Sequence, residues 1–376
     1  MKYSIKPLPP KVDLETKAIL KKVASANRYL AELKGMSETI PNETILINTL
    51  VLQEAKDSSA IENIITTHDE MYKAQLFEEM FISASAKEVS RYADALIQGF
   101  GLVRKNKLLT EKFILEIQEI LEQNDAGYRR LPGTSLINEK TGVTIYTPPQ
   151  DYDTIVSLMT NLIKYMNDDK MQDIDPLVKM AVIHFQFESI HPFYDGNGRS
   201  GRIINILYLV LNELLNIPIL YLSRYIIQYK GDYYRLLQQV RETGRWEDWI
   251  LYILTGIEQT SKETIDLIVK IRKLMQEYKQ GIRSKMPKVY SQDLLNNLFR
   301  HPYTKIEFVM KDLQVSRLTA RRYLELLVTH GFLTKEKIGR SNFYINAPLF
   351  SLFIGEPVKV QETEPIKTIN PDFSSR

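Results

Sequence analysis

The stretch that decides the fold of this chain is His191-Pro-Phe-Tyr-Asp-Gly-Asn-Gly-Arg-Ser-Gly-Arg202. An apolar segment, residues 178–190, leads into it and a second apolar segment follows, so we expect a buried helix on each side. Gly196 and Gly198 bracket Asn197, and glycines let backbone N–H groups approach an anion closely. The loop leads into a helix N-terminus, where the helix dipole adds positive charge. The sequence therefore predicts a phosphate-binding loop.

Charged side chains in the same stretch supply the other groups of a phosphoryl- or nucleotidyl-transfer site. Arg199 and Arg202 are three residues apart, so both guanidiniums lie on one side of the predicted helix. Asp195 is placed to hold Mg²⁺ against phosphate oxygens, and His191 is a candidate general base. The alternative is a glycine-rich helix cap with solvated arginines. We favour the catalytic interpretation because one short stretch supplies every group that the chemistry needs.

This stretch resembles in full the Fic motif, HPFx-[DE]-GNGRxxR. The segments His184–Ile190 and Tyr233–Trp249 are also similar to Fic proteins, and the resemblance covers about residues 8–255. It implies a protein adenylyltransferase (AMPylase) of the Fic/Doc family. Such an enzyme uses ATP as substrate with Mg²⁺ and transfers AMP to a Tyr, Thr or Ser hydroxyl of a target protein or of itself.

The resemblance also implies a role for each matching residue. His191 would deprotonate the target hydroxyl, and Asp195 would bind Mg²⁺. Arg202 would hold the γ-phosphate of ATP, and Tyr233 would line the nucleoside pocket. The remaining residues of the motif assigned to ATP binding are Gly196, Asn197, Gly198, Arg199, Ser200 and Gly201.

Residues 127–150 interrupt the helical pattern. Two short strand-like runs with glycine between them predict a β-hairpin. The resemblance implies that this hairpin is the family's flap, whose exposed strand edge pairs with an extended segment of the target protein. Thr144 and Ile145 are then the expected neighbours of the nucleotide. The alternative is a structural hairpin that closes the core.

The segment Ser58-Ser-Ala-Ile-Glu-Asn63 resembles the inhibitory motif [ST]-x-x-x-E-[GN] of Fic proteins that carry their own inhibitor N-terminal to the catalytic motif. In a helix, Ser58 and Glu62 share a face. A Glu62 carboxylate that reaches Arg202 would occupy the guanidinium that the γ-phosphate needs. We therefore expect Ser58, Glu62 and Asn63 to be inhibitory, against the alternative of a solvated helix end.

The C-terminal residues 285–350 have the pattern of a winged helix. Helices are predicted at 289–301, 304–311 and 317–329, the last with Ser316 as its N-cap and Leu318 among its inward-facing residues. Two strand-like runs around Gly339 complete a helix–turn–helix followed by a hairpin.

This C-terminal module is basic. Residues 285–346 carry 11 Lys and Arg against 5 Asp and Glu, so the module has a net charge of +6 and the rest of the chain −3. The basic residues of the predicted recognition helix and wing are Arg317, Arg321, Arg322, Lys335, Lys337 and Arg340. DNA binding is one interpretation of this charge. Dimerisation or docking of a target is the alternative, and we favour it because little in the pattern predicts base recognition.

Length and composition fit a chain of several helical domains. The chain has 376 residues, is 44% hydrophobic and has no cysteine, which excludes disulfides, thiol nucleophiles and Cys-ligated metals. No secretory signal or membrane span is apparent, so we expect a cytoplasmic protein. The fold class expected is mostly α. The predicted units are an N-terminal helical unit (1–108), a Fic-type core with a hairpin flap (109–256), a connecting helix (257–284), the winged helix (285–350) and a loose tail (351–376).

Two classes of alternative function stay open at this point. One keeps the fold but removes AMP or transfers another phospho-group. The other is a winged-helix transcription regulator whose core only senses a nucleotide. The sequence identifies neither the target protein nor the oligomeric state.

Overall fold

Two buried helices, α7 (Pro176–Ile190) and α8 (Asn197–Leu211), form the centre of the structure. Every residue of α7 from Leu177 to Ile190 is buried, and α8 is buried along almost its whole length. Asp175 caps α7 by accepting a hydrogen bond from the Leu177 backbone N–H at 2.8 Å. The predicted pair of apolar helices around the glycine-containing loop is therefore present, and it fixes where that loop lies.

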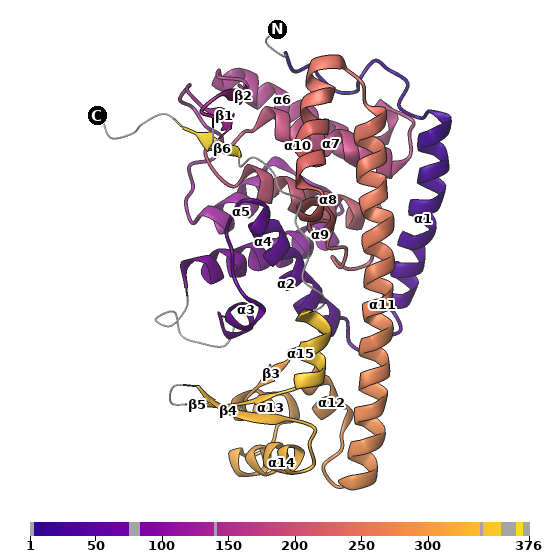
Figure 1. Cartoon of the computed structure of the whole chain (residues 1–376), viewed down its shortest axis with the longest axis vertical. Coiled ribbons are helices and arrows are strands. Elements are labelled where there is room, and N and C mark those ends of the chain that lie inside the picture. Colours follow the sequence, from indigo (N-terminus) through magenta and orange to yellow (C-terminus); the bar gives the residue numbers. More distant parts are fainter. Residues whose placement is uncertain (1–3, 75–82, 139–140, 339–340, 355–365, 371–376) are drawn as a thin grey trace, which may run out of the picture.

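Most of the remaining helices lie around this pair, and most of the C-terminal elements lie at the other end of the molecule (Figure 1). The structure is a computed structural model and describes residues 4–74, 83–138, 141–338, 341–354 and 366–370. Helix α1 packs along α11, while α4 packs against α2, α5 and α8. These outer helices are α1 (Lys17–Ser37), α2 (Glu43–Ile61), α3 (His68–Ala74), α4 (Ala84–Asn106), α5 (Glu111–Glu122), α6 (Tyr152–Asn167), the 3₁₀ helix η2 (Asp169–Met171), α9 (Ser223–Gln228), α10 (Lys230–Thr243) and α11 (Glu247–Lys285). The fold is mostly α, as predicted.

Helix α2 carries the Ser58–Asn63 segment to the centre. The Asn42 side chain caps the helix by accepting the Thr44 backbone N–H at 3.0 Å. The helix ends at Ile61, and Asn63 follows with a left-handed φ of 63°. Glu62 thus leaves the helix end next to the α7–α8 loop, rather than on a solvated surface.

Helix α11 is one continuous helix of 39 residues. The predicted boundary between the core and a connecting helix, at residue 257, falls inside it, and the helix also passes through Gly281. Buried residues recur along its full length, from Trp249 to Ile282, because its first half packs on α7 and α1 and its second half on α12 and α15. A continuous apolar face therefore outweighs the local helix-breaking tendency of the glycine.

The C-terminal unit follows the predicted order of elements. It contains α12 (Gln292–Arg300), β3 (Tyr303–Thr304), α13 (Ile306–Leu313), α14 (Arg317–Thr329), β4 (Thr334–Ile338), β5 (Ser341–Ile345) and α15 (Ala347–Ile354), with a sheet of order β3-β5-β4. Helix α14 begins after the Ser316 cap, as predicted. Leu318 does not face inward, since 80% of it is exposed. The buried residues of α14 are Ala320, Leu324 and Leu327, which lie on the opposite stripe.

The hairpin of residues 127–150 is part of a three-stranded antiparallel sheet. Its strands are β1 (Ser135–Asn138) and β2 (Thr144–Tyr146), and the third is β6 (Ile366–Ile369), in the order β2-β1-β6. The expectation of a loose tail is therefore wrong for residues 366–370. Three of the four residues in Ile366-Lys-Thr-Ile369 are β-branched, which suits a strand, and β1 offers it a free edge. Residues 355–365 and 371–376 of the expected tail lie outside the described residues.

In the described part of the chain, none of the helices combines the length and the apolar character needed to cross a bilayer.

Two helical glycines give a test of the α11 packing. A Cβ added at Gly281 would lie 2.8 Å from Cζ of Phe332, whereas one added at Gly35 of α1 would meet nothing within 4 Å. Alanine in place of helical glycine ordinarily stabilises by up to ~1 kcal/mol. We expect Gly35→Ala to raise the thermal unfolding midpoint and Gly281→Ala to lower it, as measured by circular dichroism. An equal rise in both variants would show that Phe332 does not press on α11.

Candidate active site

A cavity of about 440 Å³ lies at the N-terminus of α8. Its walls come from the end of α2, the α7–α8 loop, α10 and the strands β1 and β6. The predicted site residues that line it are Glu62, Asn63, His191, Asp195, Gly196, Asn197, Gly198, Arg199, Arg202 and Tyr233. A second cavity, of about 470 Å³, lies near the ends of α1, α4 and α8, and none of the predicted residues lines it.

The α7–α8 loop is held rigid by its own side chains. Asn197 accepts the Phe193 backbone N–H through Oδ1 and donates Nδ2 to the Phe193 carbonyl, both at 2.8 Å. The Asn197 amide therefore braces the loop and does not point at a ligand. Asp195 accepts the Gly196 N–H at 2.7 Å, and its side chain remains 80% exposed toward the cavity.

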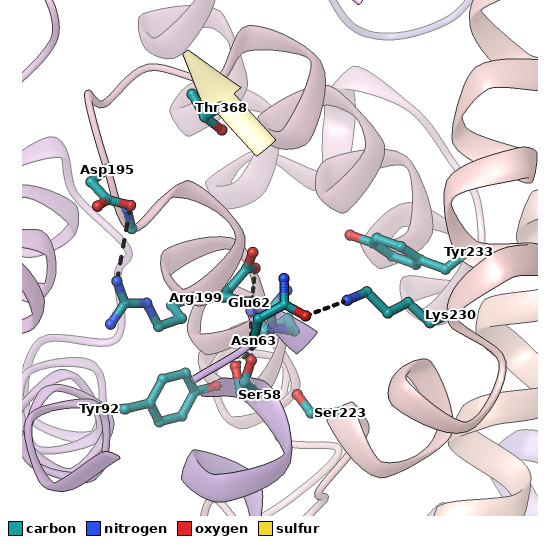
Figure 2. Close-up of polar contacts among 12 residues, drawn as sticks. Ser58, Glu62, Asn63, Tyr92, Asp195, Arg199, Ser223, Lys230, Tyr233 and Thr368 are labelled. Atoms are coloured by element: carbon teal, nitrogen blue, oxygen red, sulfur yellow. Dashed lines mark hydrogen bonds and ion pairs between the residues drawn. The ribbon is translucent and has the colours of Figure 1, made fainter. Parts of the chain in front are cut away.

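Arg202 is buried, and Ser58 and Glu62, which Figure 2 shows beside each other, supply three oxygens to it. Its Nε donates to Ser58 Oγ at 2.7 Å, and one terminal nitrogen donates both to the Ser58 carbonyl at 3.0 Å and to Glu62 Oε1 at 2.8 Å. The predicted contact between Ser58, Glu62 and Arg202 is thus present in the geometry.

Glu62 lies at the mouth of the cavity, with 35% of its side chain exposed. Burial acts to raise the pKa of Glu62, but the Arg202 charge and hydrogen bond outweigh it, so the pKa lies below its usual value and the carboxylate is ionised. A Cβ at Gly198 would lie 2.3 Å from Glu62 Oε1. Glycine at position 198 is therefore what lets the carboxylate come close to the start of α8.

The second arginine of the motif, Arg199, is surrounded by a different set of carboxylates. It pairs with Glu122 at 2.8 Å and with Glu88 at 3.3 Å, and Asp195 lies 4.0 Å away. Figure 2 shows Arg199 and Asp195 at the same side of the site. A Cβ at Gly196, where φ is +76°, would lie 2.4 Å from Glu122 Oε1. Gly196, the first glycine of the motif, thus makes room for a carboxylate, as Gly198 does.

His191 ends α7 in a left-handed conformation, with φ of 49°. Arg129 holds it there, since its Nε donates to the His191 carbonyl at 2.8 Å. Burial, followed by the charges of Arg129 and Arg241, lowers the pKa of His191 to about 3. The imidazole is therefore neutral near pH 7, and Nε2 has Thr368 Oγ1 3.4 Å away.

Tyr233 closes the side of the cavity formed by α10. Its hydroxyl lies 2.9 Å from His184 Nε2, and its ring packs against Trp249 at 5.7 Å between centroids. Burial lowers the pKa of His184 to about 3, so this histidine is a neutral hydrogen-bonding group. A flat apolar wall at this position suits a nucleoside base.

Four predicted ATP-binding residues do not reach the cavity. Thr144 and Ile145 lie on β2, which flanks β1 on the edge away from β6, and Leu136 of β1 lines the cavity instead. Ser200 is buried on α8, and Gly201 faces Glu188 and Phe187 of α7. The structure thus places β1, and not β2, at the cavity, and the sequence alone could not show this because strand order depends on long-range pairing.

The sequence interpretation missed several lining residues. Glu188 is buried one turn before His191, and burial raises its pKa to about 7. Lys367, Thr368 and Asn370 come from the tail. Lys230 does not line the cavity itself but donates to the lining residue Asn63 at Oδ1, 3.4 Å away. A lone carboxylate inside the apolar segment 178–190 was a signal for Glu188. No local pattern indicates the tail residues.

Three family models match the chain. Residues 20–101 match the model described as Fic/DOC family N-terminal, and residues 108–209 match the Fic/DOC family model. Residues 274–349 match the model of the C-terminal domain of SoFic-like protein adenylyltransferases. These segments include α2 with Glu62, the α7–α8 loop and the C-terminal unit.

Curated relatives carry related names. A probable protein adenylyltransferase of Aquifex aeolicus is 29% identical over 187 residues, which is 48% of this chain and 54% of that protein. The protein adenylyltransferase Fic of Drosophila mojavensis is 24% identical over 217 residues, which is 54% of this chain and 40% of that protein. The chain thus spans about half the length of the curated relatives it matches.

Solved structures share the fold. A Fic family protein from Desulfovibrio desulfuricans superposes with a TM-score of 0.58 at 19% identity, covering 90% of this chain and 98% of the other. A fragment of Fic-1 from Caenorhabditis elegans gives a TM-score of 0.51 at 19% identity, covering 66% of this chain and 73% of the other.

Glu188 predicts a pH dependence of stability. Its pKa rises from about 4.5 in the unfolded chain to about 7 in the fold, so the fold favours the protonated carboxyl. The free energy of unfolding should then fall as the pH rises from 4.5 through 7, by up to ~3 kcal/mol. Glu188→Gln cannot ionise, so its unfolding midpoint should rise relative to wild type between pH 5 and pH 8.

The exposed Glu32 supplies the matched control. The same comparison with Glu32→Gln should show a constant offset from wild type. Parallel curves for wild type and Glu188→Gln would mean that the pKa of Glu188 is the same in the folded and the unfolded chain.

Proposed function

Because the chain belongs to the Fic/DOC family, we propose that it is a protein adenylyltransferase that moves AMP from ATP to a side-chain hydroxyl and that its own Glu62 restrains the reaction. The observation that carries this proposal is the convergence on one cavity of a neutral histidine, a helix N-terminus and two arginines. The helix N-terminus and the arginines suit the binding of a triphosphate. The neutral histidine suits the removal of a proton from a hydroxyl acceptor.

The phosphates of ATP would bind at the N-terminus of α8. Gly196 and Gly198 leave the backbone there uncovered by Cβ atoms, and the helix end attracts negative charge. Arg199 and Arg202 would move from their carboxylate partners to phosphate oxygens, which accept the same charge-assisted hydrogen bonds. Tyr233 would contact the nucleoside.

His191 would take the proton of the acceptor hydroxyl at Nε2. The hydroxyl oxygen forms a bond to the α-phosphorus, the bond from this phosphorus to the β-phosphate bridge breaks, and pyrophosphate leaves. A pKa of about 3 describes His191 without ATP, surrounded by the charges of Arg129 and Arg241. The negative triphosphate favours the imidazolium and so shifts this pKa toward the working pH, where general-base catalysis is effective.

Asp195 is the residue that would hold Mg²⁺. The described residues contain no group of three or more His, Cys, Asp or Glu side chains arranged around a metal ion. One exposed carboxylate on the cavity wall nevertheless fits this ion, because Mg²⁺ bound to nucleotides takes one or two carboxylates together with phosphate oxygens and water. When bound, Mg²⁺ would supply positive charge that offsets the charge of the leaving pyrophosphate.

Glu62 would restrain transfer by occupying Arg202. The carboxylate stands where the γ-phosphate needs the guanidinium, and two anions cannot share that place without repulsion. ATP would then bind weakly or with its α-phosphate misaligned. A misplacement of about 1 Å can lower the rate by ~10²-fold.

The test compares four full-length proteins incubated with ATP labelled at the α-phosphate. Glu62→Gly should label acceptor proteins in a cell lysate up to ~10²-fold faster than wild type, since Arg202 is freed. Arg202→Ala should be nearly inactive, and the double variant should resemble Arg202→Ala. His191→Ala in the Glu62→Gly background should lose ~10²–10⁴-fold.

Labelling by the double variant at the rate of Glu62→Gly would contradict the role given to Arg202. Labelling by Glu62→Gly no faster than wild type would reduce the Ser58–Asn63 segment to a structural helix end.

A further inference from the structure

We propose that Thr368 is the acceptor hydroxyl for self-adenylylation, presented to His191 by the tail strand β6 of the same chain. The proposal rests on the adenylyltransferase function proposed above. It assigns that activity a modification site that lies far from the catalytic loop in sequence and beside it in the fold.

The strand β6 occupies the place expected for a target segment. It pairs antiparallel with β1 over four residues, from Ser135↔Ile369 to Asn138↔Ile366, with Leu136 opposite Thr368. Strand β2 pairs on the other edge of β1, so β6 takes the edge that would otherwise be open. Figure 1 shows β6 beside the hairpin, far from α15 and the rest of the C-terminal unit. Pairing of this kind is how an extended peptide is held for modification.

The register of β6 on β1 directs the Thr368 side chain toward His191, the proposed general base. Its Oγ1 lies 3.4 Å from His191 Nε2, and Figure 2 shows it on β6 above Glu62 and Arg199 in that view. Thr368 and Asn370 are half-buried, whereas Lys367 and Ile369 are exposed, as expected for a strand with one face on the site.

Two side-chain hydrogen bonds of Asn370, two residues after Thr368, hold strand β6 in place. Asn370 donates Nδ2 to the Tyr194 carbonyl at 2.6 Å, and its Oδ1 accepts the Thr134 hydroxyl at 3.1 Å. These two bonds join the tail both to the catalytic loop and to the residue before β1. The register that places Thr368 at His191 is therefore fixed by side chains as well as by the backbone ladder.

Two other hydroxyls near the loop, those of Tyr194 and Ser189, form hydrogen bonds with groups other than the His191 ring. Tyr194 Oη accepts the backbone N–H groups of Arg130 and Leu131, both at 3.0 Å, and Ser189 is buried behind the loop, where it accepts Arg241 Nε at 3.3 Å. Within the described ranges, Thr368 is the hydroxyl with a hydrogen-bond contact to the His191 ring. This is the contact that a general base makes with its acceptor.

The proposed reaction is a nucleophilic displacement at the α-phosphorus of ATP. Thr368 Oγ1 forms a bond to the α-phosphorus of ATP, and the bond between that phosphorus and the oxygen bridging to the β-phosphate breaks. Pyrophosphate carries away the electron pair, and the hydroxyl proton moves to His191 Nε2. The product is a phosphodiester between AMP and Thr368.

The experiment uses the full-length Glu62→Gly protein and two further substitutions in it. Thr368→Val removes the hydroxyl but keeps the β-branched shape that suits a strand, and Thr368→Ser keeps a hydroxyl. Each protein is incubated alone with ATP labelled at the α-phosphate, and tandem mass spectrometry maps AMP along the chain. We expect AMP on residue 368 in the parent and the Ser variant and its loss in the Val variant. The half-time should not change on dilution, because the acceptor is on the same chain.

Three outcomes would overturn the proposal, and they are distinguishable. AMP found elsewhere on the chain or on lysate proteins but never on residue 368 removes this site and leaves the adenylyltransferase function intact. A half-time that lengthens on dilution shows that another copy supplies the acceptor. No AMP on the chain or on any lysate protein removes the function and the site together.

Discussion

The site depends on which negative group balances the buried guanidinium of Arg202. A charge this deeply buried is costly unless it is paired and fully hydrogen-bonded. In the structure, Ser58 and Glu62 satisfy it, and Glu62 supplies the negative charge. A nucleotide triphosphate can take the guanidinium only by replacing that carboxylate. Under the proposed mechanism, the same contact holds Arg202 in the nucleotide-free state and must break before the γ-phosphate can bind.

Helix α2 is positioned so that this contact can form. One turn before Ser58, the buried Glu54 accepts the Tyr92 hydroxyl at 3.1 Å and the Ser223 backbone N–H at 3.0 Å, and Figure 2 shows Tyr92 and Ser223 on either side of Ser58. Glu54, Ser58 and Glu62 follow at intervals of four residues, so they share one helix face. The first anchors the helix, and the other two reach Arg202. The Ser58–Asn63 segment, to which we assign the inhibitory role, is thus part of the core packing and not an appended strand or loop.

The sequence predicts the local features of this arrangement well and its long-range features poorly. The cap at Ser316 is set by neighbouring residues and was predicted correctly. The pairing of β6 with β1 joins residues more than 200 positions apart, and no periodicity within Ile366–Ile369 signals its partner. For the same reason Thr144 was assigned to the cavity although it lies on the far strand of the sheet. Leu318 was misplaced because two helical stripes of α14 carry leucine, and only packing decides which one is buried.

Competition between Glu62 and the γ-phosphate is measured most directly by comparing nucleotides that differ in that phosphate. Isothermal titration calorimetry would give the dissociation constants of ATP and AMP for wild type and for Glu62→Gly. Because AMP has no γ-phosphate, the substitution should tighten ATP binding by about tenfold, the value of one charge-assisted hydrogen bond, and leave AMP binding unchanged. Equal tightening of both nucleotides, or of neither, would contradict the claim that Glu62 and the γ-phosphate compete for Arg202.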